Sequence, residues 1–119
     1  MVEETQVPRG AVQRALEVQL FGRFTTRESI IAIGTDAGVL IKNNPERIGL
    51  VLVNTGLALI TFGLKRDLLV NKGFILSQAG DTMTSNYIED AQFPTHELSA
   101  IADGAGGELY VVEFIRSTL

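Results

Sequence analysis

The sequence of 119 residues contains no cysteine and no tryptophan, and its only histidine is His96. Without cysteine the chain can form neither a disulfide nor a thiolate metal site. One histidine does not supply the several converging ligands that hold a transition metal. The lack of tryptophan, with Tyr87 and Tyr110 as the only tyrosines, counts against an aromatic platform for stacking sugars. These absences exclude a disulfide scaffold and give poor support to a metal centre.

Two further absences concern charge and hydrophobic length. The formal net charge is −4, so the chain lacks the basic excess with which proteins displace counterions from nucleic acid. The longest apolar stretches are broken at Asn54, Gly56 and Lys65 before they reach the length of a membrane span. The start of the chain, MVEETQVPRG, has neither the basic residues nor the apolar stretch of a secretory signal. We therefore expect no nucleic-acid or membrane partner, and a protein used in a cytoplasm or in a particle assembled there.

What the sequence does contain is a succession of short apolar segments separated by turn residues. From Ser29 onwards, segments rich in Ile, Val and Leu alternate with turn signals such as Asn43-Asn44-Pro45 and Asn71-Lys72-Gly73. This spacing is typical of a sandwich. The pattern predicts an all-β fold, an antiparallel β-sandwich or jelly roll over residues 29–119, preceded by an extended N-terminal arm over residues 1–28.

Residues 47–63, RIGLVLVNTGLALITFG, predict a β-hairpin, because Asn54-Thr55-Gly56 has the composition of a three-residue turn. Both faces of this hairpin are apolar, whereas a hairpin with one wet face alternates apolar and polar residues. Its back must therefore be covered, either by a second sheet of the same domain or by another subunit. We expect a homo-oligomer, most readily a trimer, held by Val51 and Val53 together with Leu57 and Leu59, or with Ala58 and Ile60 in their place. The Gly-rich stretch 103–107 predicts a second hairpin link.

The N-terminal arm carries apolar side chains that an isolated segment cannot bury. Val12, Leu16, Leu20 and Phe24 recur every four residues as on a helix, while Leu16, Val18 and Leu20 also alternate as on a strand. Ordering a chain costs roughly 1–2 kcal/mol per residue, so we expect the arm to be ordered only where a partner surface covers it. The alternative is that it adds a strand or helix to its own domain. The arm residues expected to contact the partner are Arg9, Arg14, Leu16, Val18, Leu20, Phe21, Arg23 and Phe24.

Residues capable of catalysis form no recognisable constellation. The Gly-rich stretch 103–107 precedes a predicted strand instead of a helix N-terminus, so it does not match a phosphate-binding loop. No serine stands in a Gly-x-Ser-x-Gly motif. We expect no enzymatic activity, no cofactor and no bound metal. The acidic residues that lack the spacing of a calcium loop or the surroundings of a glycosidase pair are Asp81, Glu89, Asp90, Glu97 and Asp103.

Three stretches together resemble small structural proteins of tailed bacteriophages. They are Arg47 with the alternating segment up to Gly56, the stretch GFILSQAG at 73–80, and Ala100-Ile101-Ala102 through Glu113. The resemblance covers about the C-terminal two-thirds of the chain and leaves out the arm. It implies a virion role, since such proteins decorate or cement capsids or sit in head fibres and tail parts. Among these we expect a decoration or cement protein that binds the major capsid protein on a head assembled in the host cytoplasm. The arm would then reach onto the capsid shell or onto a neighbouring copy of the protein. A receptor-binding or carbohydrate-binding module of a phage fibre or tail is the alternative.

Overall fold

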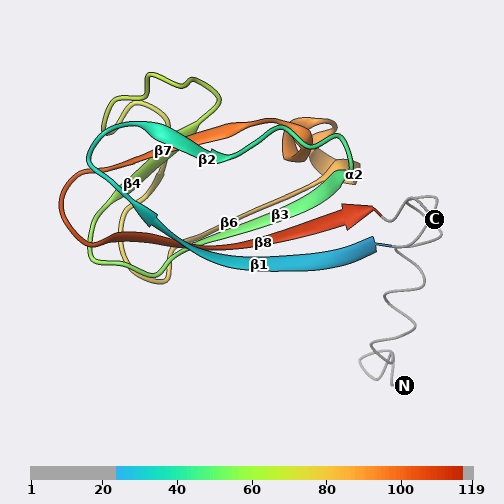
Figure 1. The fold of residues 1–119 in the computed structure, drawn as a ribbon, viewed down its shortest axis with the longest axis horizontal. Coiled ribbons are helices and arrows are strands. Elements are labelled where there is room, and N and C mark those ends of the chain that lie inside the picture. The colour runs from blue at the N-terminus through green and yellow to red at the C-terminus, as the bar shows by residue number, and fades with distance from the viewer. Residues whose placement is uncertain (1–23, 117–119) are drawn as a thin grey trace.

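The structure, a computed structural model, describes residues 24–116. These residues form two antiparallel sheets of four strands each, packed face to face (Figure 1). Two short helical turns, α2 (Tyr87–Asp90) and η2 (Phe93–Thr95), lie between the sixth and seventh strands. Sheet A contains, in spatial order, β1 (Phe24–Ile33), β8 (Gly107–Arg116), β3 (Arg47–Asn54) and β6 (Thr82–Asn86). Sheet B contains β2 (Gly38–Ile41), β7 (Leu98–Ala102), β4 (Ile60–Gly63) and β5 (Phe74–Leu76).

The strand order is that of an eight-stranded jelly roll. The chain behaves as one long antiparallel ribbon doubled back at residues 64–73, so that β4 pairs with β5, β3 with β6, β2 with β7 and β1 with β8. The ribbon then wraps on itself, and the pairs β3–β8 and β4–β7 complete the two sheets. The predicted all-β sandwich or jelly roll is confirmed.

The predicted hairpin over residues 47–63 is wrong. Its first strand, β3, lies in sheet A between β8 and β6, whereas its second, β4, lies in sheet B between β7 and β5. The turn residues mark a reversal of the chain, but the reversal carries the chain from one sheet to the other. Asn54 is fully buried there, and its side-chain amide donates hydrogen bonds to the carbonyls of Ala58 (3.0 Å) and Leu76 (2.9 Å). These bonds fix the crossover in the core.

The predicted second hairpin link is also a crossover, since β7 lies in sheet B and β8 in sheet A. The two crossovers pack side by side: the backbone N–H of Leu57 donates to the carbonyl of Gly106 at 2.9 Å. They approach so closely that a Cβ on Gly56 would lie 2.3 Å from the carbonyl oxygen of Gly106. Gly106 itself has a φ of 85°, in the left-handed region that favours glycine.

The core lies between the sheets. It explains why one of the two faces of residues 47–63 is apolar. On β3, Leu50 and Leu52 point inward and are fully buried. On β4, Ile60 and Phe62 do the same from the opposite sheet. Because side chains alternate along a strand, the residues between them point away from the core. The buried core residues are Ile33, Leu40, Ile41, Leu50, Leu52, Ala58, Ile60, Phe62, Leu76, Leu98, Ala100, Ala102, Leu109 and Val111.

The back of β4 is covered by the chain's own loop. Thr61, which points away from the core, is nonetheless fully buried, and its hydroxyl accepts a hydrogen bond from the backbone N–H of Asn71 at 3.0 Å. Leu68 of the same loop is buried, and it comes within 3.1 Å of the position that a Cβ would take on Gly63. The back of β4 is thus covered within the domain, but by a loop and not by the second sheet that the sequence suggested.

The first strand begins earlier than the expected boundary after residue 28. β1 starts at Phe24 and pairs with β8 along its whole length, from Phe24 opposite Arg116 to Ile33 opposite Gly107. Residues 24–28, assigned to the arm from the sequence, are thus the first half of an edge strand of sheet A. The remaining arm residues, 1–23, lie outside the described residues.

Candidate assembly surface

The strand register defines a face of sheet A that points away from the core. Residues directly opposite one another in an antiparallel pair share a face. The outer face therefore carries three full rows of four side-chain positions, one from each strand. These rows are Ile30–Tyr110–Val53–Thr82, Glu28–Val112–Val51–Thr84 and Thr26–Phe114–Gly49–Asn86.

The centre of this outer face is apolar. Its two central strands contribute Val51, Val53, Tyr110, Val112 and Phe114, each half-buried by its neighbours. On the β1 side the patch continues with Ile30, whose side chain is 68% exposed. The β6 side is polar, with two threonines and an asparagine. Large contiguous apolar surfaces are typical of interaction sites, which makes these six residues the candidate surface, and we call them the sheet A patch.

Three residues at one end of the patch pack on each other. Phe114 lies over Gly49, where a Cβ would come within 3.0 Å of the Phe114 ring. The ring of Phe24 meets that of Phe114 edge-on, with centroids 6.0 Å apart and an interplanar angle of 70°. Phe24 is also the first described residue, so the chain enters the domain at the rim of the sheet A patch.

Charge on the outer face is sparse: Glu28 and Glu108 lie on it, and Arg116, opposite Phe24, is paired with Glu46 at 2.9 Å. Glu28 sits beside the patch and accepts a hydrogen bond from the Tyr110 hydroxyl at 2.6 Å. This hydrogen bond raises the pKa of Tyr110 above its ordinary value. Glu108, at the crossover end, accepts a hydrogen bond from the Thr55 hydroxyl at 2.9 Å. A partner of this face would thus meet apolar side chains flanked by carboxylates.

The structure separates the four residues expected to form one interface. Val51 and Val53 belong to the sheet A patch, as the alternation along β3 predicts. Leu57 and Leu59 instead lie in the crossover between β3 and β4 and belong to no strand of sheet A. Leu57 is 94% exposed, and the backbone N–H of Leu59 donates to Asp103 Oδ1 at 3.0 Å.

Of the expected arm contacts, Phe24 is described above. The others, Arg9, Arg14, Leu16, Val18, Leu20, Phe21 and Arg23, lie outside the described residues.

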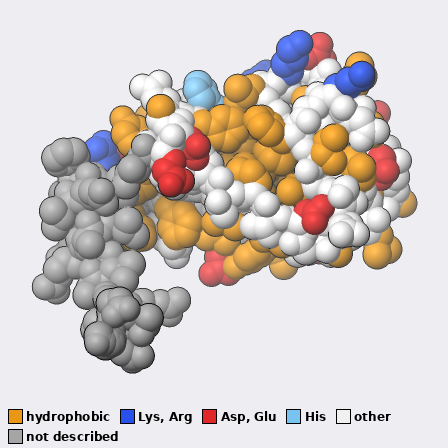
Figure 2. Space-filling model, turned by 180° about the vertical axis from the view of Figure 1, so that it is seen from behind, with side chains coloured by type: hydrophobic (Ala, Val, Ile, Leu, Met, Phe, Trp, Pro, Cys, Tyr) orange, Lys and Arg blue, Asp and Glu red, His pale blue; other side chains and the backbone are white. Residues whose placement is uncertain are grey.

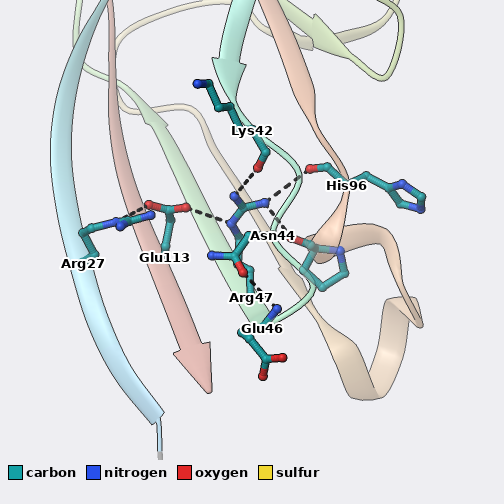
Figure 3. Close-up of polar contacts among 8 residues, drawn as sticks. Arg27, Lys42, Asn44, Glu46, Arg47, His96 and Glu113 are labelled. Carbon is teal, nitrogen blue, oxygen red and sulfur yellow. Dashed lines mark hydrogen bonds and ion pairs between the residues drawn. The ribbon is translucent and has the colours of Figure 1, made fainter. Parts of the chain in front are cut away.

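A buried ion pair supports the patch from the inner side of sheet A. The Arg47 guanidinium on β3 donates through Nε to Glu113 Oε2 on β8 at 2.8 Å (Figure 3). Its two other nitrogens donate to the carbonyl oxygens of Lys42 (2.6 Å), Pro94 (3.0 Å) and His96 (3.3 Å). Arg47 therefore ties the central strands of sheet A to the two segments that flank sheet B.

Glu113 lies between two arginines, since its other oxygen accepts a hydrogen bond from Arg27 Nε of β1 at 2.9 Å (Figure 3). Burial alone would raise the pKa of Glu113, but the hydrogen bonds from Arg27 and Arg47 outweigh it and hold the pKa below its ordinary value. A groove of about 370 Å³ between β1 and β2 opens onto this network. Because Arg47 and Glu113 make all these contacts internally, we interpret the network as structural.

Sequence reasoning identified Arg47 and Glu113 only as landmarks of the phage resemblance. A signal was present in β8, where Leu109 and Val111 point inward and Glu113 is the next inward position. A carboxylate at an inward position needs a buried partner. Arg47 is a cation at the start of β3, the apolar strand that pairs with β8.

A second groove, of about 380 Å³, lies between β5 and β6. The Phe74 ring stacks on that of Phe62, with centroids 5.2 Å apart, and meets Phe93 edge-on at 5.9 Å. Figure 2 shows hydrophobic side chains gathered on the side of the molecule opposite to that seen in Figure 1. The polar lining of the groove includes Asp90, which accepts a hydrogen bond from the Ser85 hydroxyl at 2.9 Å.

The carboxylates considered for chemistry are used in local hydrogen bonds. Asp81 accepts from the Ser77 hydroxyl and from the backbone N–H groups of Gln78 and Ser77, which lowers its pKa. Glu97 accepts two hydrogen bonds from Arg66, and this lowers the pKa of Glu97. Among residues 24–116, no group of three or more His, Asp or Glu side chains is placed to hold a metal ion.

Within the same described range, no helix is long and apolar enough to cross a membrane. Comparison with protein-family models, with curated proteins and with solved structures gives no match for this chain. The geometry of the described residues, together with the resemblance noted in the sequence, therefore carries the functional interpretation.

Proposed function

We propose that this protein is a structural subunit of a tailed-phage virion, which decorates the outside of the head in many copies and stabilises the shell. The copies associate with one another as a homo-oligomer and bind the major capsid protein. The proposal draws on the resemblance of residues 47–56, 73–80 and 100–113 to small phage structural proteins. The single structural observation that carries it is the sheet A patch.

The patch suits assembly because it presents apolar area on a stiff platform. Each large side chain that a partner removes from water contributes on the order of 1–2 kcal/mol when about half of its surface is already buried. Several such side chains can offset the translational and rotational entropy lost on association. The backbone beneath them is paired on both sides in the two central strands, β3 and β8. Little further ordering of the patch is therefore needed when a partner binds.

A second candidate function is a binding module of a phage fibre or tail. The feature that favours it is the groove between β5 and β6, where Phe74 and Phe93 stand beside the carboxylate of Asp90. Apolar walls with one or two polar groups are typical of small-ligand sites. A module of this kind would be present at the few fibre or tail positions of a particle, whereas a decoration protein covers the head.

Copy number in purified particles tests the proposal and separates the two functions. Quantitative mass spectrometry against the major capsid protein should give hundreds of copies per particle, in a fixed ratio to the capsid subunits. Stripping the protein with mild denaturant should lower the temperature at which the shell ruptures, and re-adding the purified chain should restore it. A handful of copies would support the fibre or tail function instead, and absence from the particle would overturn both.

A further inference from the structure

We propose that residues 11–23 of one copy cover the sheet A patch of a second copy, so that the subunits are joined by exchanged arms. This inference names the partner of the patch. It does not depend on the virion function, because it concerns the association of the purified chain alone. Of the two partners expected for the arm, the capsid shell and a neighbouring copy, it selects the neighbouring copy.

The place where the chain enters the domain is the first argument. Phe24 is the first residue of β1, and it lies on the outer face with its ring packed edge-on against Phe114. The preceding residues therefore start at the rim of the patch. The patch keeps accessible surface: its five central residues are half-buried, and Ile30 at its edge is 68% exposed.

The length of the segment is the second argument. As an extended chain, residues 11–23 reach about 43 Å, compared with about 33 Å for a ten-residue strand such as β1. As a helix they reach about 20 Å, which still spans the three rows of the patch. Either conformation of the segment is long enough to cover the apolar side chains of one sheet.

The chemistry of the segment matches the face. Its apolar side chains, Leu16, Val18 and Leu20, alternate with Glu17 and Gln19, so an extended segment has one side to bury and one to leave in water. Its charge is also complementary. Two arginines against one glutamate give residues 11–23 a net charge of +1. Beside the patch, Glu28 and Glu108 are acidic, while the charge of Arg116 is offset by its pairing with Glu46.

A second copy is favoured over the segment's own domain by the direction of β1. To lie on its own patch, the segment would have to reverse its direction before Phe24 and pass back over the rings of Phe24 and Phe114. No such reversal is needed for the segment to reach the patch of a second copy. Such an exchange of identical elements is a low-cost route to oligomers.

The absence of native cysteine allows a direct test by cross-linking in the full chain. Leu16→Cys, Val18→Cys and Leu20→Cys are each mixed with Val112→Cys and treated with a short bis-maleimide. We expect a mixed dimer with at least one arm position. In the matched control, Leu57→Cys takes the place of Val112→Cys. Leu57 is 94% exposed but lies in the β3–β4 crossover, away from the patch, so its links to the arm variants should stay at background level.

Three results would overturn the inference. A link formed only within one chain, in Val18→Cys/Val112→Cys, would place the segment on its own domain. A link formed only between two Val112→Cys chains would mean that two patches pack on each other. No link at any arm position would mean that the segment does not reach the patch.

An energetic readout complements the cross-linking. Leu20→Asp and Val112→Asp should each weaken self-association by roughly tenfold or more, measured by sedimentation equilibrium. If the two side chains meet across the interface, the double variant should lose less than the sum of the single losses. Losses that add fully would show that Leu20 and Val112 act at separate surfaces, and would contradict the inference.

Discussion

Arg47 and Glu113 form a buried ion pair across the two central strands of sheet A, with 2.8 Å between Nε and Oε2. Their side chains are 2% and 5% exposed. A charge taken this far out of water is tolerated when it is paired and its remaining hydrogen-bonding groups are satisfied. Arg47 meets that condition through three backbone carbonyls, and Glu113 meets it through Arg27. The pair therefore links β3 and β8 to the segments before β3 and β7.

Removing Arg47 should destabilise the fold strongly. Arg47→Met leaves Glu113 buried without its main partner and three carbonyls without a donor, and breaking a buried pair in this way costs about 3–5 kcal/mol. Arg47→Lys keeps the charge but cannot reproduce the planar fork of donors, so we expect a smaller but clear loss. Urea denaturation measures both.

Arg27→Ala is the matched control: Arg27 is 62% exposed, so its pairing with Glu113 should be worth less than about 1 kcal/mol. An Arg47→Met chain as stable as the wild type would contradict this role.

Stability should fall on acidification because of Glu113. Its pKa is lowered in the folded state, so the stability that it contributes is present above the ordinary pKa of about 4.3 and is lost as the pH falls through the folded-state pKa. The free energy of unfolding should therefore decrease as the pH is lowered below about 5, with a smaller slope in Glu113→Gln. Asp81 and Glu97, both half-buried, also have lowered pKa values and account for part of the remaining slope. An unchanged slope in Glu113→Gln would show that this carboxylate is not linked to folding.

Two glycines near the β7–β8 crossover, Gly104 within it and Gly107 at the start of β8, should respond differently to alanine. A Cβ on Gly107 would lie 2.6 Å from the Ile33 carbonyl oxygen and 2.7 Å from Ala102 Cβ, so Gly107→Ala should cost more than about 2 kcal/mol through displaced backbone. A Cβ on Gly104 meets nothing within 4 Å. Gly104→Ala should be neutral or stabilising by up to about 1 kcal/mol, because it restricts the unfolded chain. Thermal unfolding of the two variants gives the comparison, and equal effects would refute the close packing of the crossover.

Self-association should depend on Val51 and not on Leu57. Val51→Asp places a charge in the sheet A patch, on a side chain that points away from the core, so the variant should fold and sediment as a monomer. Leu57→Asp changes a residue that is 94% exposed at the crossover, and it should sediment like the wild type. Sedimentation velocity at micromolar concentration distinguishes the two. A stable wild-type monomer, or dissociation caused by Leu57→Asp alone, would place the interface elsewhere.

The fold class could be predicted from the sequence because it depends on local patterns. The alternation along β8 and the regular turn signals each require only neighbouring residues. The pairing of strands could not be predicted in the same way. A turn such as Asn54-Thr55-Gly56 specifies a reversal, but whether it joins paired strands or crosses between sheets is decided by distant partners, here β6 and β8 for β3.

The candidate site was predicted in part for the same reason. The outward direction of Val51 and Val53 follows from the two-residue period of one strand and is confirmed. Their neighbours on the patch, Tyr110 and Val112, come from a strand about sixty residues later, and only the β3–β8 register brings them together. Leu57 and Leu59 were grouped with Val51 because a local hairpin was expected. In the structure they lie in the crossover between the two sheets, so that grouping is wrong.

Electron cryo-microscopy of purified particles tests the central claim most directly. The account predicts jelly-roll domains on the outer surface of the head, in which the sheet A patch, with Val51 and Val112 at its centre, is covered by protein from a neighbouring subunit. Density for the domain at the tail alone, or on the head with the sheet A patch facing open solvent, would contradict it.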